Sequence, residues 1–292
     1  KSLWAVNFGL TVLLMILLRL GGMNWYETVC HSFSTMSTGG FSPKGNSIES
    51  YSSYVQLTMT LFMFLAATNF ILHFRLFRGK FSYFKDDECR HYIYLIAVTI
   101  AVITISLISH GSYEPFKAFV HAAFQTATIL SSAGFASTDF DQWPALCKGM
   151  LLILAITGAC GGSTCGGLKL SRIILMFRYS IAQIKNCVFP HALNNVQMNN
   201  QRIKTDVMDK VFSFVFLYVA VGVIIGIIML FISDLNFQEA LSASLTCMAN
   251  IGPGIERLGP TGNFAFLPES AKWVLSITML IGRLEVYTVL VL

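Results

Sequence analysis

Six long apolar runs alternate with polar connectors along this chain. Five of them are continuous and about 20 residues long, the length of helix that crosses the hydrocarbon core of a bilayer. The sixth contains several glycines. The runs lie at Leu3 to Leu20, Val55 to Phe74, Tyr92 to Ser109, Val211 to Ile232 and Trp273 to Leu292, with the interrupted one from Gly149 to Phe177. The pattern predicts six membrane spans, and since the chain begins and ends at apolar runs, we expect these residues to be part of a longer protein.

Three shorter segments between the spans repeat in one register. In each, an aromatic residue stands fifteen residues before a glycine: Trp25 before Gly40, Phe119 before Gly134 and Phe237 before Gly252. About twelve helix-compatible residues begin there, and a helix of that length covers about 18 Å, which reaches the bilayer midplane but not the far side. The repeated unit is therefore helix, half-helix, extended loop and helix.

The loop after each half-helix combines glycine with small, mostly polar residues. Bare backbone at membrane depth is tolerated only where protein buries it or where it lines a water-filled path. The carboxyl end of a helix carries about half a negative charge, and glycine permits backbone angles that turn carbonyl oxygens inward in place of hydration water. The alternative is an ordinary glycine turn between membrane helices. We predict a cation filter formed by the backbone of Thr38, Gly39, Gly40, Ser132, Ala133, Gly134, Asn250, Ile251 and Gly252.

Glycines also interrupt the fourth span, and the last span contains an arginine. Five of the ten residues 158–167 are glycine, and each glycine costs a helix about 1 kcal/mol relative to alanine. Arg283 places a charge where it costs at least about 2.5 kcal/mol unless it faces water or a partner. The alternatives are a packing kink for the loop and a structural ion pair or a snorkelling side chain for Arg283. These features mark candidate functional residues within the membrane: Gly158, Gly161, Gly162, Ser163, Thr164, Gly166, Gly167 and Arg283.

Composition and charge agree with a multi-pass membrane protein. Apolar residues make up 54% of the 292 residues and charged residues 12%, a balance that a water-soluble surface does not accommodate. Twelve of the twenty Lys and Arg residues lie in connectors 75–91 and 169–210, which marks these connectors as cytoplasmic and the filter mouths as external. The cations do not interleave with aromatic residues as in a nucleic-acid surface. Neither metal-ligand spacing nor a nucleophile motif appears, so we predict no enzyme and no tightly bound cofactor.

These motifs resemble the TrkH/TrkG branch of the Trk/Ktr/HKT superfamily of potassium transporters. The most specific matches are Asn250-Ile251-Gly252-Pro253-Gly254, the run 259–265 and Gly282-Arg283-Leu284-Glu285. The resemblance implies an all-α polytopic membrane protein with four pore repeats around one pseudo-fourfold pore, the first repeat being missing from these residues. The second to fourth repeats are then residues 1–80 with filter 37–42, residues 81–185 with filter 131–136 and intramembrane loop 158–167, and residues 186–292 with filter 250–254.

The resemblance also implies a function and partners. It points to the pore-forming subunit of a potassium uptake system in the inner membrane, with K⁺ held by filter carbonyls. The loop 158–167 then lies beneath the filter and Arg283 lines the pore. We hypothesise that the two form a gate, so that deleting the loop raises ion flux. The expected partners are a second copy in the bilayer and a cytosolic nucleotide-binding ring of the TrkA type. Two alternatives stay open: a sodium- or mixed-cation-conducting member of the superfamily, and a secondary transporter with broken helices, which predicts inverted repeats.

Overall fold

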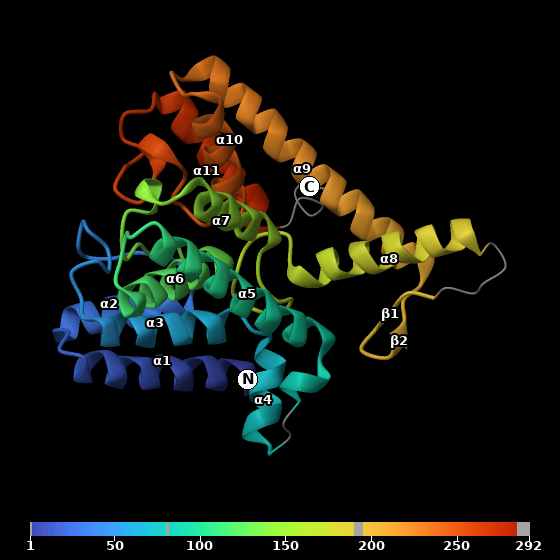
Figure 1. The fold of residues 1–292 in the computed structure, drawn as a ribbon, viewed down its shortest axis with the longest axis horizontal. Helices are drawn as coiled ribbons and strands as arrows, with labels where there is room; N and C mark the ends of the chain where they lie inside the picture. Colours follow the sequence, from blue (N-terminus) through green and yellow to red (C-terminus); the bar gives the residue numbers. More distant parts are fainter. Residues whose placement is uncertain (1, 80–81, 190–194, 285–292) are drawn as a thin grey trace.

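The computed structural model describes residues 2–79, 82–189 and 195–284, and this part of the chain is almost entirely helical (Figure 1). It consists of three successive units. The first contains α1 (Ser2–Leu20), α2 (Trp25–Met36), α3 (Ser53–Ala66) and α4 (Phe70–Phe77). The second contains η1 (Tyr83–Lys85), α5 (Asp87–Ser109), α6 (Pro115–Leu130), η2 (Phe140–Gln142), α7 (Ala145–Thr157) and α8 (Leu170–Val188). The third contains β1 (Gln197–Met198), β2 (Gln201–Arg202), α9 (Thr205–Ile232), α10 (Phe237–Met248), η3 (Glu256–Leu258) and α11 (Glu269–Arg283).

The half-helices α2, α6 and α10 each pack between two other helices. α2 contacts α1 and α3, α6 contacts α3 and α5, and α10 contacts α9 and α11. In α6, every residue from Ala122 to Leu130 is buried. The helix ends that precede the predicted filter segments therefore lie inside the protein.

Three described helices, α1, α5 and α9, are long and apolar enough to cross a membrane. They coincide with three of the predicted runs. The interrupted run is also divided as its glycines suggest, because α7 ends at Thr157 and α8 begins at Leu170. The last predicted run extends beyond Leu284, and its end lies outside the described residues.

The run from Val55 to Phe74, predicted as one membrane span, is not a single straight helix. Instead α3 and α4 are separated by a short break and bent by 98°. Asn69 explains the break locally, because its side chain accepts a hydrogen bond from the Ile71 N–H at 2.9 Å and so caps α4. The break also leaves backbone groups without helical partners, and these groups pair with residues 158–167, the glycine loop. The Phe70 N–H donates to the Gly162 carbonyl and the Cys160 N–H to the Ala67 carbonyl, both at 3.2 Å.

A short β-hairpin, β1–β2, joins α8 to α9 and was not predicted. Its turn residues, Asn199 and Asn200, have φ angles of 51° and 60°, and two left-handed residues in succession define the type I′ turn that suits a two-residue hairpin loop. The hairpin and the end of α8 project from the helical body (Figure 1).

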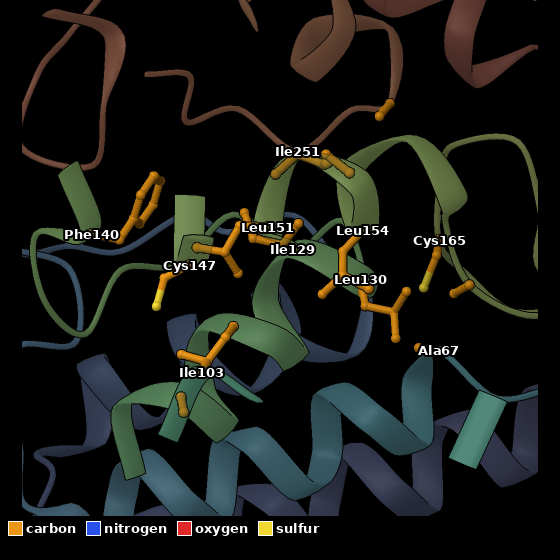
Figure 2. Close-up of a cluster of buried hydrophobic side chains, with 14 of the residues drawn as sticks. Ala67, Ile103, Ile129, Leu130, Phe140, Cys147, Leu151, Leu154, Cys165 and Ile251 are labelled. Carbon is orange, nitrogen blue, oxygen red and sulfur yellow. The ribbon is translucent and has the colours of Figure 1, made fainter. Parts of the chain in front are cut away.

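The central core unites parts of the chain that are distant in sequence. Ile129 and Leu130 of α6 and Leu151 and Leu154 of α7 form its middle. Figure 2 shows three further contributors around them, Ile251 from the predicted fourth filter, Cys165 from the glycine loop and Ala67 from the α3–α4 break. One apolar cluster therefore supports both the predicted filter and the predicted gate.

Candidate functional site

The three predicted filter segments have the same backbone turn. The residue after each helix cap is left-handed, with φ of 54° at Thr38, 55° at Ser132 and 57° at Asn250. Two residues later the chain has a positive φ again, of 70° at Gly40, 81° at Gly134 and 101° at Gly252. Because a positive φ is uncommon for residues other than glycine, its recurrence at one position of three segments indicates a shared local structure.

Two hydrogen bonds close each of these turns. The N–H two residues after the cap donates five residues back, at 2.8 Å from Gly39 to Ser34, 2.9 Å from Ala133 to Thr128 and 2.9 Å from Ile251 to Thr246. The N–H of each left-handed residue donates three residues back, at 3.1 to 3.2 Å. This is the Schellman arrangement, which satisfies carbonyls of the last helical turn. The chain therefore turns away at the buried end of each half-helix.

The three loops lie side by side because two of their glycines touch the backbone of the next loop. A Cβ atom on Gly40 would lie 1.8 Å from the Ala133 carbonyl oxygen, and one on Gly134 would lie 2.0 Å from the Ile251 carbonyl oxygen. Glycine is therefore required at both positions. A Cβ atom on Gly252 would have no described atom within 4 Å. The structure thus packs segment 37–42 against segment 131–136, and segment 131–136 against segment 250–254. Among the described residues, none packs in this way against Gly252.

The loops also concentrate unpaired carbonyl oxygens. Within the described ranges, no N–H or O–H group donates to the carbonyls of Thr38, Gly39, Ser132, Ala133, Asn250 and Ile251. Thr38, Ser132, Ala133 and Ile251 are buried. Since buried carbonyls are normally hydrogen-bonded, a group of carbonyl oxygens that accept no hydrogen bond calls for another partner. A dehydrated cation is a ligand of this kind.

The glycine loop, residues 158–167, lies against the ends of the half-helices. Its base is closed by a hydrogen bond from the Leu170 N–H to the Ala159 carbonyl at 2.9 Å. Gly158, Gly162 and Gly167 have φ angles of 65°, 74° and 81°. A Cβ atom on Gly166 would lie 2.4 Å from the Ala249 carbonyl oxygen, at the end of α10. The glycines therefore serve both the turns of the loop and its close approach to α10.

Thr164 is the point where the glycine loop meets the second filter loop and Arg283. The Thr164 carbonyl oxygen accepts a hydrogen bond from Arg283 Nη1 at 3.0 Å and lies 3.1 Å from the Thr38 hydroxyl oxygen. The Thr164 hydroxyl lies 3.3 Å from the Met36 carbonyl oxygen, at the end of α2. Residues from the predicted filter and the predicted gate are thus in direct contact.

The other two predicted gate residues support the loop itself. The Ser163 hydroxyl donates to the Cys160 carbonyl at 2.6 Å. The Gly161 N–H donates to the carboxylate of Glu88 at 2.8 Å. Sequence reasoning missed Glu88 and also Asn69, against which Gly162 packs. The sequence signals were weak: Glu88 is an acidic residue shortly before the run Tyr92 to Ser109, and Asn69 is a polar residue inside the run Val55 to Phe74.

An ion pair between the buried Glu239 and the exposed Arg257 fastens the amino end of α10 to η3, just after the predicted filter segment 250–254. Glu239 forms a capping box with Asn236 and binds Arg257 through both carboxylate oxygens, Oε1 to Nε and Oε2 to Nη2, each at 2.7 Å. The hydrogen bonds from Arg257 hold the pKa of Glu239 at about 2, below its ordinary value of 4.5. The pair therefore joins the first turn of α10 to η3, the segments on either side of the predicted filter segment 250–254.

Removing Arg257 should lower the stability of the fold more at neutral pH than at acid pH. A carboxyl group with a lowered pKa stabilises the fold above its unfolded pKa, and this stabilisation is lost as the pH falls through the folded pKa. We expect Arg257→Ala to lower the denaturation temperature at pH 7, and the difference from the unchanged protein to be smaller at pH 3. Thermal denaturation of the detergent-purified protein measures this, with the exposed Lys117→Ala as control. An equal difference at both pH values would contradict the role of the ion pair.

All 292 residues match the family model described as TrkH, cation transport protein. The chain is 35% identical to the Trk system potassium uptake protein TrkH of Vibrio parahaemolyticus, over 100% of this chain and 61% of that protein. It is 34% identical to TrkI of Halomonas elongata and 33% identical to TrkG of Escherichia coli, over 100% of this chain and 60% of each relative.

A solved structure shows the same likeness. The crystal structure of the potassium transporter TrkH from Vibrio parahaemolyticus matches with a TM-score of 0.94 at 34% identity, over 100% of this chain and 63% of that one. The match confirms the predicted all-α polytopic membrane fold. The chain spans about three fifths of the length of these relatives. It belongs to the TrkH family of cation transport proteins.

Proposed function

We propose that this chain forms most of the ion path of a potassium-selective Trk-type uptake system. The observation that carries the proposal is the row of filter loops whose carbonyl oxygens accept no hydrogen bond from the described residues. The named relatives are potassium uptake proteins, which supports K⁺ as the ion. K⁺ is then held by backbone carbonyls of the three filter loops.

The half-helices favour a cation at this place. α2, α6 and α10 all end at the filter loops, and each carboxyl end carries the equivalent of about half a negative charge. The carbonyl oxygens replace the water that a monovalent ion sheds. Charge and ligands thus come from the backbone, which is why side chains differ between the loops while Gly40, Gly134 and Gly252 recur.

A fourth loop completes the proposed filter. Gly40 and Gly134 each touch the following loop, whereas a Cβ atom on Gly252 would meet no described atom within 4 Å. In a pseudo-fourfold arrangement, this is where the next loop belongs. We place residues 1–80, 81–185 and 186–292 as the second, third and fourth repeats, with the first repeat supplied by residues outside this sequence.

The glycine loop and Arg283 form the proposed gate beneath the filter. Support comes from Thr164, whose carbonyl lies next to both Thr38 and Arg283. The loop places backbone across the path, and the positive charge of Arg283 repels a cation that leaves the filter. Opening then requires Thr164 to move away from both neighbours.

The cations of connectors 75–91 and 169–210 support a cytoplasmic location for these segments. The family resemblance supports the inner membrane as the location of the protein. The hairpin and the end of α8 belong to the second connector and project from the body (Figure 1). Their projection supports docking of a cytosolic nucleotide-binding ring of the TrkA type. The family resemblance supports a homodimer in the bilayer.

Ion flux through the complete native protein in liposomes tests the proposed function. We expect K⁺ and Rb⁺ to cross at least about tenfold faster than Na⁺, because carbonyl filters discriminate by the fit and number of ligands. The flux should need no gradient of a second ion. Equal rates for the three cations would favour the mixed-cation alternative, and a strict need for a coupled ion would favour a secondary transporter.

A further inference from the structure

Glu88 is a buried carboxylate in the first turn of α5, outside both the filter and the gate. Its Oε1 atom accepts two backbone hydrogen bonds, from the Gly161 N–H at 2.8 Å and the Ser171 N–H at 3.0 Å. Only 7% of the residue is exposed. Gly161 lies in the first half of the glycine loop and Ser171 in the first turn of α8, just after the loop. One oxygen atom therefore joins both flanks of the loop to α5.

The amino end of α8 explains why a carboxylate is suitable here. The first N–H groups of a helix have no partner within the helix, and they favour a negative charge. The helix-capping residue, Lys169, provides no side-chain cap for α8. Glu88 takes over this role from a different helix, so the exit of the loop is positioned by α5.

The two residues before Glu88 hold the hairpin. Asn199, in the hairpin turn, accepts a hydrogen bond from the Asp87 N–H at 2.7 Å and donates from Nδ2 to Asp86 at 3.0 Å. The Asn199 N–H donates to Asp87 Oδ2 at 3.1 Å, and Arg178 of α8 donates to the same oxygen at 2.9 Å. The acidic turn, residues 86–88, thus contacts the hairpin through two residues and the glycine loop through the third.

We infer that Glu88 is a positioning residue of the glycine loop and that the acidic turn connects the loop to the projecting hairpin. A partner that moves the hairpin thereby moves the residue that holds both flanks of the loop. The effect on ion flux rests on the proposed gating function of the loop, whereas the positional effect does not.

Native cysteines report the position of the loop directly. Cys160 and Cys165 in the loop are 1% and 4% exposed, and Cys147 of α7, in the same core cluster, is 0% exposed. We expect Glu88→Ala to raise the alkylation rates of Cys160 and Cys165 by N-ethylmaleimide roughly tenfold, because local opening becomes easier when its hydrogen bonds are lost. Cys147 should react as slowly as before. Peptide-resolved mass spectrometry on the complete purified protein measures the three rates.

Two variants separate positioning from general loss of structure. Glu88→Gln keeps an acceptor oxygen and should retain most of the protection of Cys160 and Cys165. A variant that merely unfolds exposes Cys147 as well, and equal acceleration of all three cysteines in Glu88→Ala would overturn the inference. Unchanged labelling of Cys160 and Cys165 would overturn it too.

Flux measured on the same samples distinguishes this inference from the proposed gate. Faster labelling of the loop with higher K⁺ flux supports both. Faster labelling with unchanged flux supports the positioning role of Glu88 and contradicts the gating role of the loop.

A separate variant tests the connection between the hairpin and the acidic turn. Asn199→Gly keeps a residue that tolerates positive φ but removes both side-chain bonds to the acidic turn. We expect a smaller acceleration of Cys160 and Cys165 labelling than in Glu88→Ala, and no further acceleration when the two changes are combined. Additive effects, or no effect of Asn199→Gly, would overturn the connection.

Discussion

Replacing Arg283 by glutamine is expected to raise K⁺ flux through the complete protein. Glutamine retains an N–H donor for the Thr164 carbonyl but removes the positive charge. At an effective dielectric constant of about 20, two unit charges roughly 8 Å apart repel by about 2 kcal/mol, which corresponds to about a 30-fold change in rate. We therefore expect an increase between severalfold and about 30-fold in liposome flux, with K⁺ still preferred over Na⁺ because the filter is unchanged.

Two further substitutions identify which property of Arg283 matters. Arg283→Lys keeps the charge and loses the guanidinium geometry, so its flux should rise less than that of Arg283→Gln. Arg283→Ala loses both the charge and the bond to Thr164, and its flux should rise most. The matched control is Lys272→Gln, which removes a charge from the exposed amino end of the same helix, α11. Unchanged flux in Arg283→Ala would remove Arg283 from the gate.

These substitutions are also a cleaner test than deletion of the glycine loop. The loop pairs with backbone groups at the α3–α4 break and with Glu88. Deleting it leaves the Phe70 N–H and the Ala67 carbonyl without these partners, and an unpaired buried polar group costs about 1 to 3 kcal/mol. Higher flux after deletion would still agree with the gate, but lower flux could arise from misfolding.

The shared turn of the three proposed filter loops could be predicted from the sequence because its causes are local. Each loop needs a positive φ at one fixed position, and glycine supplies it at Gly40, Gly134 and Gly252. The aromatic residue fifteen positions earlier marks the start of α2 and of α10, whereas α6 begins four residues before Phe119, at Pro115. The left-handed residues Thr38 and Ser132 were less obvious, because nothing in their side chains favours that conformation.

The α3–α4 break and Glu88 could not be predicted in the same way because their causes are distant in sequence. An apolar run has the same hydropathy whether its helix is straight or bent by 98°. The partners of the break lie in the glycine loop, about 90 residues later. Acidic residues at the start of a helix are usually explained by the helix dipole alone, and only the fold shows that Glu88 reaches Gly161 and Ser171.

Gly134→Ala is expected to abolish selective conduction. The new Cβ atom would lie 2.0 Å from the Ile251 carbonyl oxygen, so either the third or the fourth filter loop must move. Alanine at the φ of 81° found at Gly134 adds about 1 to 2 kcal/mol of backbone strain. We expect K⁺ flux to fall at least about tenfold and the preference for K⁺ over Na⁺ to be lost, since both depend on carbonyl positions. Liposome flux with K⁺, Rb⁺ and Na⁺ measures both quantities.

Two other glycines make this prediction specific. Gly149 lies in α7 with open space around it, and Gly149→Ala should leave flux unchanged because alanine favours a helix. Gly252 has a φ of 101°, and a Cβ atom on it would meet no described atom within 4 Å. Gly252→Ala therefore tests for the loop that we propose to pack there. If that loop packs against Gly252 as Ile251 packs against Gly134, the two variants lose K⁺ flux to a similar degree. Normal selective flux in Gly134→Ala would instead show that the contact between the third and fourth loops does not shape the ion path.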